Sequence, residues 1–329
     1  MSAGRTARFR DAAGGVLEGS VAEAGSWRIG DVDQWVMIRG RSTDNPLLVI
    51  LHGGPGSSET ALFRTTNAAL EDAFTVVYWD QRGAGRSYSR SIPPQSMRVD
   101  RFVADLDELI DRLAARFARP VVLLGHSWGS FLGVLYASRF PTKVAAYVGV
   151  GQVADMAASE AASYAFALDK ARERGHAKAV RQLLDIGPPP HTLRQLGTQR
   201  RWLMAMGGAF GPNLTLPKLL WRGLTAPEAS PFDLIRLVQG SNFSTQALWN
   251  ELMAANLQRE VRRLEMPVFL VLGRLDMQVV ASVSAEYFEI LDAPQKQLFW
   301  FETSAHMAPF EEPERFNRLM IETVRPLAV

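Results

Sequence analysis

The segment Val121–Ser130 reads VVLLGHSWGS, and it is the part of the chain that decides the fold. An apolar run predicts a buried strand, the pattern Gly-x-Ser-x-Gly follows at once, and a helix is expected to begin near Trp128. So tight a turn strains the serine backbone, and Gly125 and Gly129 keep side chains away from it. Glycines around a serine also occur in ordinary turns, but the flanking strand and helix favour a nucleophile elbow that exposes the Ser127 hydroxyl.

Further apolar runs, rich in valine and leucine, lie on both sides of this segment and alternate with stretches of helical period. They predict strands at residues 33–40, 46–52, 74–79, 121–124, 145–150, 268–272 and 297–301. Their continuous apolarity is typical of strands that are covered on both faces. Between residues 102 and 113, apolar side chains recur every three or four positions, which predicts a helix packed on the sheet. The sequence therefore predicts an α/β fold whose mostly parallel sheet is flanked by helices.

The alternation stops between residues 155 and 260, where the sequence predicts only helices. These helices are expected to break at Gly175, at Pro188–Pro190 and at Gly207–Gly208. Because core strands come before and after this stretch, we expect an inserted helical cap and not an independent domain. The predicted division is a core of residues 1–154 and 261–329 and a cap of residues 155–260.

Composition narrows the class of protein. The chain has 329 residues, of which 47% are hydrophobic and 21% are charged, so it can bury a sizeable core. The 36 lysine and arginine residues nearly balance the 34 acidic ones, and the formal charge of +2 does not favour a nucleic-acid partner. The chain has no cysteine, which excludes disulfides and thiol nucleophiles. No histidine and carboxylate cluster has metal-ligand spacing, and we expect no metal.

The sequence also bears on location. Met1–Leu17 contains Arg5, Arg8 and Arg10 but no apolar stretch of signal-peptide length after them. No later segment has the uninterrupted apolar length of a membrane span. We therefore expect a cytoplasmic protein with no membrane partner, and the sequence leaves its oligomeric state open.

A serine hydroxyl becomes a good nucleophile only beside a histidine base that a carboxylate orients. Of the five histidines, only His306 follows the last predicted strand, the position that completes the order serine, acid, histidine after such an elbow. Asp276 follows the penultimate strand and is the predicted acid, although a turn aspartate often bonds only its own backbone. Asp155, beyond an earlier strand, is the alternative acid. Asp80 also ends a strand, and we interpret it, with Arg82, as bracing a loop.

Acyl transfer also needs two hydrogen-bond donors for the oxyanion of a tetrahedral intermediate. One is expected to be the backbone N–H of Trp128, directly after the nucleophile. The other is expected from the glycine-rich loop after the second core strand, where Gly53 lets the backbone approach the substrate and the N–H of Gly54 is the predicted donor. This loop has neither the lysine nor the spacing of a phosphate-binding P-loop.

Three motifs together resemble the proline iminopeptidase-like branch of the α/β-hydrolase superfamily. They are HGGPG at residues 52–56, DQRGAGRS at residues 80–87 and GHSWGS at residues 125–130. The resemblance covers the sheet on both sides of the insertion. It implies an α/β-hydrolase fold, a serine hydrolase activity, a helical cap and no cofactor.

The chain departs from this family in two places. True proline iminopeptidases bind a free amino terminus through a cap motif around Glu-Asn-His-Tyr-Phe, which is absent here; the cap offers Trp249 and Glu251 as candidate substrate-binding residues. Most cap aromatics are nevertheless expected to pack the cap, and Glu251 fits a solvated helix position as well. A proline often follows the acid in the family, whereas Met277–Val280 follows Asp276.

These observations predict a serine hydrolase that cleaves an ester, lactone or amide bond of a small, partly apolar molecule through an acyl-enzyme. The alternative within the same fold is a proline iminopeptidase. From other classes, a lyase that uses the same triad as a base and a scaffold that binds a small molecule without turnover stay open. A small-molecule substrate is the only partner that we expect.

Overall fold

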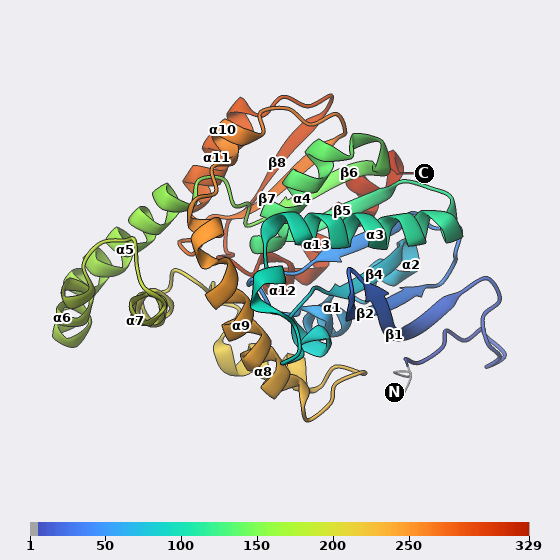
Figure 1. Ribbon diagram of the computed structural model, residues 1–329, viewed down its shortest axis with the longest axis horizontal. Helices are drawn as coiled ribbons and strands as arrows, with labels where there is room; N and C mark the ends of the chain where they lie inside the picture. The colour runs from blue at the N-terminus through green and yellow to red at the C-terminus, as the bar shows by residue number, and fades with distance from the viewer. Residues whose placement is uncertain (1–5, 329) are drawn as a thin grey trace.

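The structure, a computed structural model, describes residues 6–328 and is built on an eight-stranded sheet (Figure 1). The strands are β1 (Val21–Ile29), β2 (Val32–Gly40), β3 (Leu47–Leu51), β4 (Thr75–Asp80), β5 (Val121–His126), β6 (Val144–Val150), β7 (Val268–Gly273) and β8 (Lys296–Phe301). Their order across the sheet is β1-β2-β4-β3-β5-β6-β7-β8. β2 pairs antiparallel with β1 and β4, and the other neighbours are parallel. The predicted mostly parallel sheet is confirmed.

Helices cover both faces of this sheet. The α-helices among residues 6–328 are α1 (Thr60–Thr66), α2 (Leu70–Ala73), α3 (Val99–Phe117), α4 (Trp128–Arg139), α5 (Met156–Glu173), α6 (Ala177–Ile186), α7 (Leu193–Ala205), α8 (Leu216–Leu224), α9 (Asp233–Met253), α10 (Leu257–Glu260), α11 (Ala281–Ile290), α12 (Ala308–Glu311) and α13 (Pro313–Leu319). In β3, Val49 and Leu51 pack with α3, α4 and α11, whereas Leu48 and Ile50 pack with α1, α2, α12 and α13. This two-residue alternation is the period of a strand, and it gives the molecule two hydrophobic layers.

The two edge strands differ from the prediction. β1 is absent from the predicted strands because only its end residues, Val21 and Ile29, are buried, and Gly25 and Ser26 interrupt its apolar residues. β8 is predicted, but the expectation that it is covered on both faces is wrong. It lies at the other edge of the sheet, and most of its side chains are only partly buried.

Helices α5–α10 lie between β6 and β7, and we call residues 155–260 the cap segment. The helices end where the sequence predicts breaks, at Glu173, Ile186 and Ala205. α5, α6 and α7 share a small hydrophobic cluster of their own. The division of the chain into a core and a cap at residues 155 and 260 stays a prediction.

The two ends of the cap segment lie side by side at the core. The N–H of Leu257 donates to the carbonyl oxygen of Ala154 at 2.7 Å, and the N–H of Met156 donates to that of Ala255 at 3.1 Å. The chain therefore leaves the core and returns to it at almost the same point.

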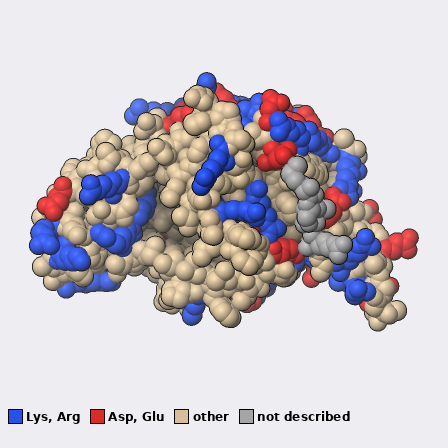
Figure 2. Space-filling view, turned by 60° about the horizontal axis from the view of Figure 1, so that its bottom comes forward, with Lys and Arg blue, Asp and Glu red and all other residues tan. Residues whose placement is uncertain are grey.

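α8 and α9 present an apolar face to the surroundings. Its exposed side chains are Leu216, Leu220, Trp221, Leu224, Phe232, Leu234, Ile235 and Val238. Figure 2 brings this side of the molecule forward. It shows basic side chains gathered on the lobe at the left of the view. Within residues 6–328, every helix falls short of the combined length and apolarity that crossing a bilayer requires.

Candidate active site

Ser127 stands at a sharp turn between β5 and α4. Its backbone angles are φ 54° and ψ −121°, a strained region for a residue with a side chain. A Cβ atom at Gly125 would lie 2.4 Å from the carbonyl oxygen of Gly129, and one at Gly129 would lie 1.9 Å from that of Leu51. The predicted strain and the need for both glycines are thereby confirmed.

His306 and Asp276 form a buried pair in the loops after β8 and β7. Nδ1 of His306 lies 2.8 Å from Oδ2 of Asp276, and Oδ1 of Asp276 accepts the N–H groups of Gln278 and Val279 at 2.8 and 3.0 Å. Nε2 of His306 is buried and has no hydrogen-bond partner among residues 6–328. Since Asp276 holds Nδ1–H, the lone pair of an imidazole in this tautomer is on Nε2.

The end of β6 connects this pair to the elbow. The N–H of Ser127 donates to the carbonyl oxygen of Val150 at 2.9 Å. At the next residue, Gly151, a Cβ atom would lie 3.1 Å from Nδ1 of His306 and 3.3 Å from Oδ2 of Asp276. The serine, the imidazole and the carboxylate therefore gather at one edge of the sheet, the carboxyl ends of its parallel strands.

Asp155, the alternative acid, serves a different purpose. Its Oδ1 accepts the N–H of Ala158 at 3.0 Å and caps α5, while its Oδ2 accepts Nδ2 of Asn256 at 2.6 Å. These contacts fasten the two ends of the cap segment together. The structure brings Asp276, and not Asp155, against His306.

The glycine-rich loop lies against the elbow. A Cβ atom at Gly53 would lie 3.2 Å from Cβ of Ser127, so a side chain there would crowd the serine. Gly54 has φ 118°, a conformation that favours glycine. Among residues 6–328, the backbone N–H groups of Gly54 and Trp128 have no acceptor. Both are therefore free to donate to another group at this edge.

Gln81 ties the glycine-rich loop to the elbow, a role that sequence reasoning missed. Its side chain donates to the carbonyl oxygen of His52 at 3.1 Å and accepts Nε1 of Trp128 at 2.9 Å. Its N–H donates to Nε2 of His52 at 3.1 Å, and Nδ1 of His52 donates to the carbonyl oxygen of Gly53 at 2.8 Å. The DQRG motif was the available signal, since Gln81 belongs to it.

The interpretation of Asp80 as a loop brace is confirmed, with partners other than Arg82. Its carboxylate accepts Oγ of Ser58, Oγ1 of Thr60 at 3.1 Å and the N–H of Arg86 at 2.8 Å. Arg82 pairs instead with a carboxylate of α3, Asp105, at 2.8 Å.

The two candidate residues of the cap lie elsewhere. Trp249 is buried in the main hydrophobic core beside Leu248 and Leu252. Glu251 is exposed, and its Oε2 accepts the N–H of Val99 at 3.0 Å, the first residue of α3. The structure does not bring Glu251 to the serine, because its side chain satisfies a helix terminus.

Two buried glutamates that each keep one oxygen without a partner among residues 6–328 went unnoticed in the sequence. Glu160 of α5 is fully buried; its Oε1 pairs with Arg200, and its Oε2 has no partner among residues 6–328. Glu59 pairs with His126 at 2.6 Å and also keeps one buried oxygen without a partner in that range. Neither glutamate belongs to a sequence motif that would have identified it.

Within residues 6–328, no group of three histidine, aspartate or glutamate side chains could hold a metal ion.

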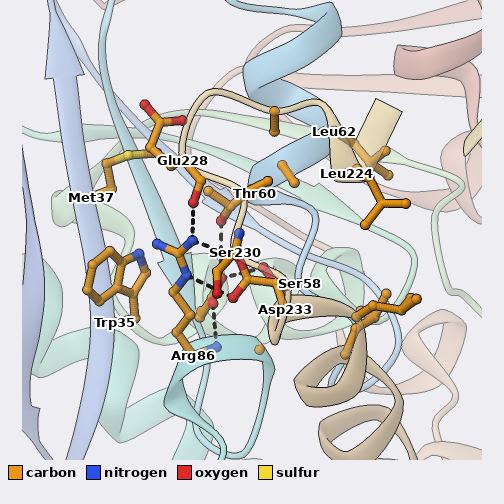
Figure 3. A pocket seen from close by; sticks show the side chains of 18 of the residues that line it. Trp35, Met37, Ser58, Thr60, Leu62, Arg86, Leu224, Glu228, Ser230 and Asp233 are labelled. Atoms are coloured by element: carbon orange, nitrogen blue, oxygen red, sulfur yellow. Dashed lines mark hydrogen bonds and ion pairs between the residues drawn. The ribbon is translucent and has the colours of Figure 1, made fainter. Parts of the chain in front are cut away.

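An apolar cavity of about 150 Å³ lies between the core and the helices α8 and α9 (Figure 3). Its apolar lining includes Trp35, Met37, Leu62, Leu219, Leu220, Leu224, Leu234 and Leu237. At its polar side, Arg86 pairs with Asp233 at 2.7 Å. The cavity reaches Ser58, but Ser127 and His306 do not line it. It is therefore a separate space beneath the cap.

The sheet topology and the strained serine beside a buried imidazole–carboxylate pair define the class of α/β hydrolases. The match of the family's sequence profile to residues 46–313 shows that the chain belongs to the alpha/beta hydrolase fold family.

Relatives agree with the predicted branch. The chain is 33% identical over 313 residues to the Bacillus subtilis (strain 168) protein "Probable aminopeptidase YbaC", a match of 93% of this chain and 97% of the relative. It is 34% identical over 104 residues to proline iminopeptidase of Lactobacillus helveticus (strain DPC 4571), a match of 32% of this chain and 34% of the relative. A proline iminopeptidase-related protein of Thermus thermophilus has the same fold, with a TM-score of 0.66, 20% identity and coverage of 94% and 99%. The predicted resemblance is confirmed.

Proposed function

We propose that the protein is a serine hydrolase that cleaves an ester, lactone or amide bond of a small, partly apolar molecule through an acyl-enzyme. One observation carries the proposal: His306 is held by Asp276 through Nδ1, while its buried Nε2 has no partner among residues 6–328, at the edge where Ser127 stands. An imidazole oriented in this way is the base that a serine nucleophile requires.

In the proposed reaction, Oγ of Ser127 attacks the carbonyl carbon of the substrate, and its proton passes to Nε2 of His306. Asp276 stabilises the imidazolium that forms. The N–H groups of Gly54 and Trp128 donate to the oxyanion. His306 then gives the proton to the departing alcohol or amine. A water molecule, deprotonated by the same imidazole, releases the acid and restores the serine.

Replacing the nucleophile tests this mechanism. Ser127→Ala should fold normally and lower kcat for a nitrophenyl ester by up to about a millionfold. A fluorophosphonate probe should label the wild-type chain at Ser127, as located by mass spectrometry. Ser57→Ala is the matched control, because the one hydrogen bond of the Ser57 hydroxyl among residues 6–328 is to the hydroxyl of Ser241, and this variant should still be labelled. Turnover that survives in Ser127→Ala contradicts the mechanism.

A second candidate is an aminopeptidase, and one observation favours it beyond the relative's name. The N–H of Val280, in the loop after Asp276, donates to Oγ of Ser159 at 2.9 Å, so α5 is docked beside the site. The next residue is Glu160, whose buried carboxylate has a free oxygen among the described residues. A buried ammonium group needs such a carboxylate to offset its lost hydration.

The two candidates separate by their need for a free amine. We expect a medium-chain acyl ester and an N-acetylated prolyl arylamide to be hydrolysed with kcat/KM no lower than that of the free prolyl arylamide. A strong preference for the free prolyl substrate, lost in Glu160→Gln but kept in the control Glu251→Gln, would establish the aminopeptidase.

A further inference from the structure

A second imidazole–carboxylate pair, His126 with Glu59, lies directly behind His306. Nδ1 of His126 is 2.6 Å from Oε1 of Glu59, and Nε2 is 2.8 Å from the carbonyl oxygen of His306. The rings of the two histidines are tilted against each other, with their centroids 4.8 Å apart. All three residues are at most 5% exposed. The proposed reaction gives this buried pair no step of its own.

Both ring nitrogens of His126 face groups that only accept hydrogen bonds. A neutral imidazole has a single N–H and can serve one of them, whereas an imidazolium serves both. Burial by itself lowers the pKa of His126, but the charge and hydrogen bond of Glu59, the carbonyl of His306 and the charge of Asp276 outweigh burial and raise it. The geometry and the charges both favour a doubly protonated His126.

We propose that Glu59 and His126 are positioning residues for the reaction: Glu59 keeps His126 doubly protonated, and His126 fixes the main chain of His306 by donating to its carbonyl oxygen. The inference rests on the proposed function, because it takes His306 as the base. A fixed carbonyl holds the imidazole of His306 on its path between Asp276 and the serine.

The surroundings isolate this pair from other cations. His126 is contacted on its edge by Phe310, with ring centroids 6.3 Å apart. The titratable groups facing it are Glu59 before α1, Asp276 after β7 and His306 after β8. Glu311 of α12 lies near Asp276, and burial raises the pKa of Glu311. Within residues 6–328, Glu59 has no ion-pair partner except His126. Neutralising Glu59 therefore removes the one anion in direct contact with this imidazole.

The test is Glu59→Gln in the full-length protein, assayed with a nitrophenyl ester. The amide keeps the shape of the side chain but not its charge, so His126 loses a proton and one of its two hydrogen bonds. We expect kcat/KM at neutral pH to fall about tenfold. We also expect the loss to grow as pH rises and to shrink in acid, because without Glu59 the pKa of His126 falls and the second N–H of its ring is lost at lower pH.

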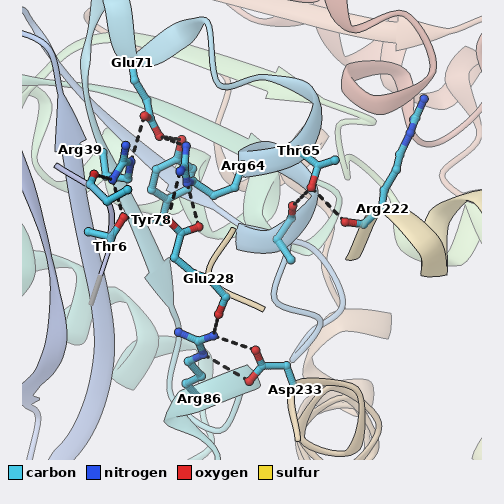
Figure 4. Close-up of polar contacts among 12 residues, drawn as sticks. Thr6, Arg39, Arg64, Thr65, Glu71, Tyr78, Arg86, Arg222, Glu228 and Asp233 are labelled. Carbon is cyan, nitrogen blue, oxygen red and sulfur yellow. Dashed lines mark hydrogen bonds and ion pairs between the residues drawn. The ribbon is translucent and has the colours of Figure 1, made fainter. Parts of the chain in front are cut away.

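Glu71→Gln is the matched control. Glu71 is equally buried and paired with Arg39 and Arg64, in a corner formed by β2, β4 and α1 (Figure 4). It should lower the melting temperature and leave the pH profile of kcat/KM unchanged. A change in the pH profile of Glu59→Gln that Glu71→Gln does not share is a readout that loss of stability alone would not give.

The outcomes separate the two proposals. Turnover in Ser127→Ala overturns the proposed function whatever Glu59→Gln does. An inactive Ser127→Ala together with a Glu59→Gln enzyme of wild-type kcat/KM and pH profile overturns the positioning role alone. Should Glu59→Gln fail to fold, ¹⁵N spectra of the histidine-labelled wild type decide, with His126→Gln assigning the signal. Two protonated nitrogens on His126 at pH 7 support the proposal, and a neutral ring at pH 7 overturns it.

Discussion

The elbow can form because Gly129 has no Cβ atom. A Cβ atom there would meet the carbonyl oxygen of Leu51 at 1.9 Å, and that oxygen belongs to the backbone of the central strand β3. No change of rotamer relieves a clash with main chain. The elbow therefore requires glycine at position 129, because a larger residue would collide with the backbone of Leu51. This requirement is separate from the strained backbone conformation of Ser127.

Gly129→Ala should lower the free energy of unfolding by more than about 3 kcal/mol, because β3 or α4 must shift to admit the methyl group. Gly197→Ala is the control. Gly197 lies inside α7 with open space around its Cβ position, so alanine there should stabilise the protein by about 0.5–1 kcal/mol. Urea unfolding of the two variants measures both values. Equal effects of the two substitutions would contradict the packing argument.

The identity of the acid gives a second prediction at this scale. Asp276→Asn should preserve the fold and lower kcat by about a thousandfold or more, because the amide favours the wrong tautomer of His306. Asp155→Asn should be mild, since asparagine caps a helix about as well as aspartate. Steady-state kinetics with a nitrophenyl ester compares them, and the reverse order would identify Asp155 as the acid.

Sequence patterns found the residues that stand at strand ends. Ser127, Asp276 and His306 could be named because each follows an apolar run, and a parallel sheet brings such positions to one edge. The pair of Glu59 and His126 could not be found in this way, because its partners are 67 positions apart and the histidine lies inside a motif that already has an explanation. Pairing between loops depends on tertiary packing, which leaves no periodic signal.

At the scale of elements, two ion pairs attach the cap segment to the core. Glu228, between α8 and α9, accepts Nε of Arg64 on α1 at 3.0 Å, and Arg64 also pairs with Glu71 at 2.7 Å (Figure 4). Asp233, at the start of α9, pairs with Arg86 at 2.7 Å. Both attachments lie beside the apolar cavity, so they hold α8 and α9 over it.

These attachments should weaken in acid. Burial by itself would raise the pKa of Glu228 and of Asp233, but hydrogen bonds and charges of the arginines outweigh burial and lower the pKa of both. A carboxylate with a lowered pKa stabilises the folded state above its ordinary pKa, and this contribution is lost as pH falls through the folded-state value. We therefore expect the protection of cap amides against hydrogen exchange, taken relative to the intrinsic exchange rate at each pH, to fall as pH drops below about 4.

Glu228→Gln tests the same attachment at neutral pH. It should lower the free energy of unfolding by about 1–3 kcal/mol, because Arg64 loses one of its two buried anions. In this variant, exchange in α8 and α9 should also depend less on acid than in the wild type. Glu265→Gln, which makes no ion pair among residues 6–328, serves as the control. Identical acid dependence in Glu228→Gln and the wild type would contradict the attachment.

For the whole molecule, the sequence predicted the parallel sheet well and its borders poorly. Interior strands such as β3 and β5 are apolar throughout because helices cover both faces, and that pattern is easily read. β1 has one partner strand and a partly exposed surface, so its residues carry a mixed pattern. The arrangement of α5–α10 was not predictable beyond their breaks, since helix periodicity does not say which helices meet.

The closed base of the cap segment has a consequence for how such a protein can change. The backbone groups of Ala154 and Met156 form hydrogen bonds with residues 257 and 255. The intervening segment of about a hundred residues could therefore be exchanged without a new linker. A chimaera that keeps these positions and takes the corresponding segment of its Bacillus subtilis relative should still react with a fluorophosphonate at Ser127 while its substrate preference shifts. Substrate recognition and the catalytic step then depend on separate segments of the chain, and the two segments can evolve at different rates.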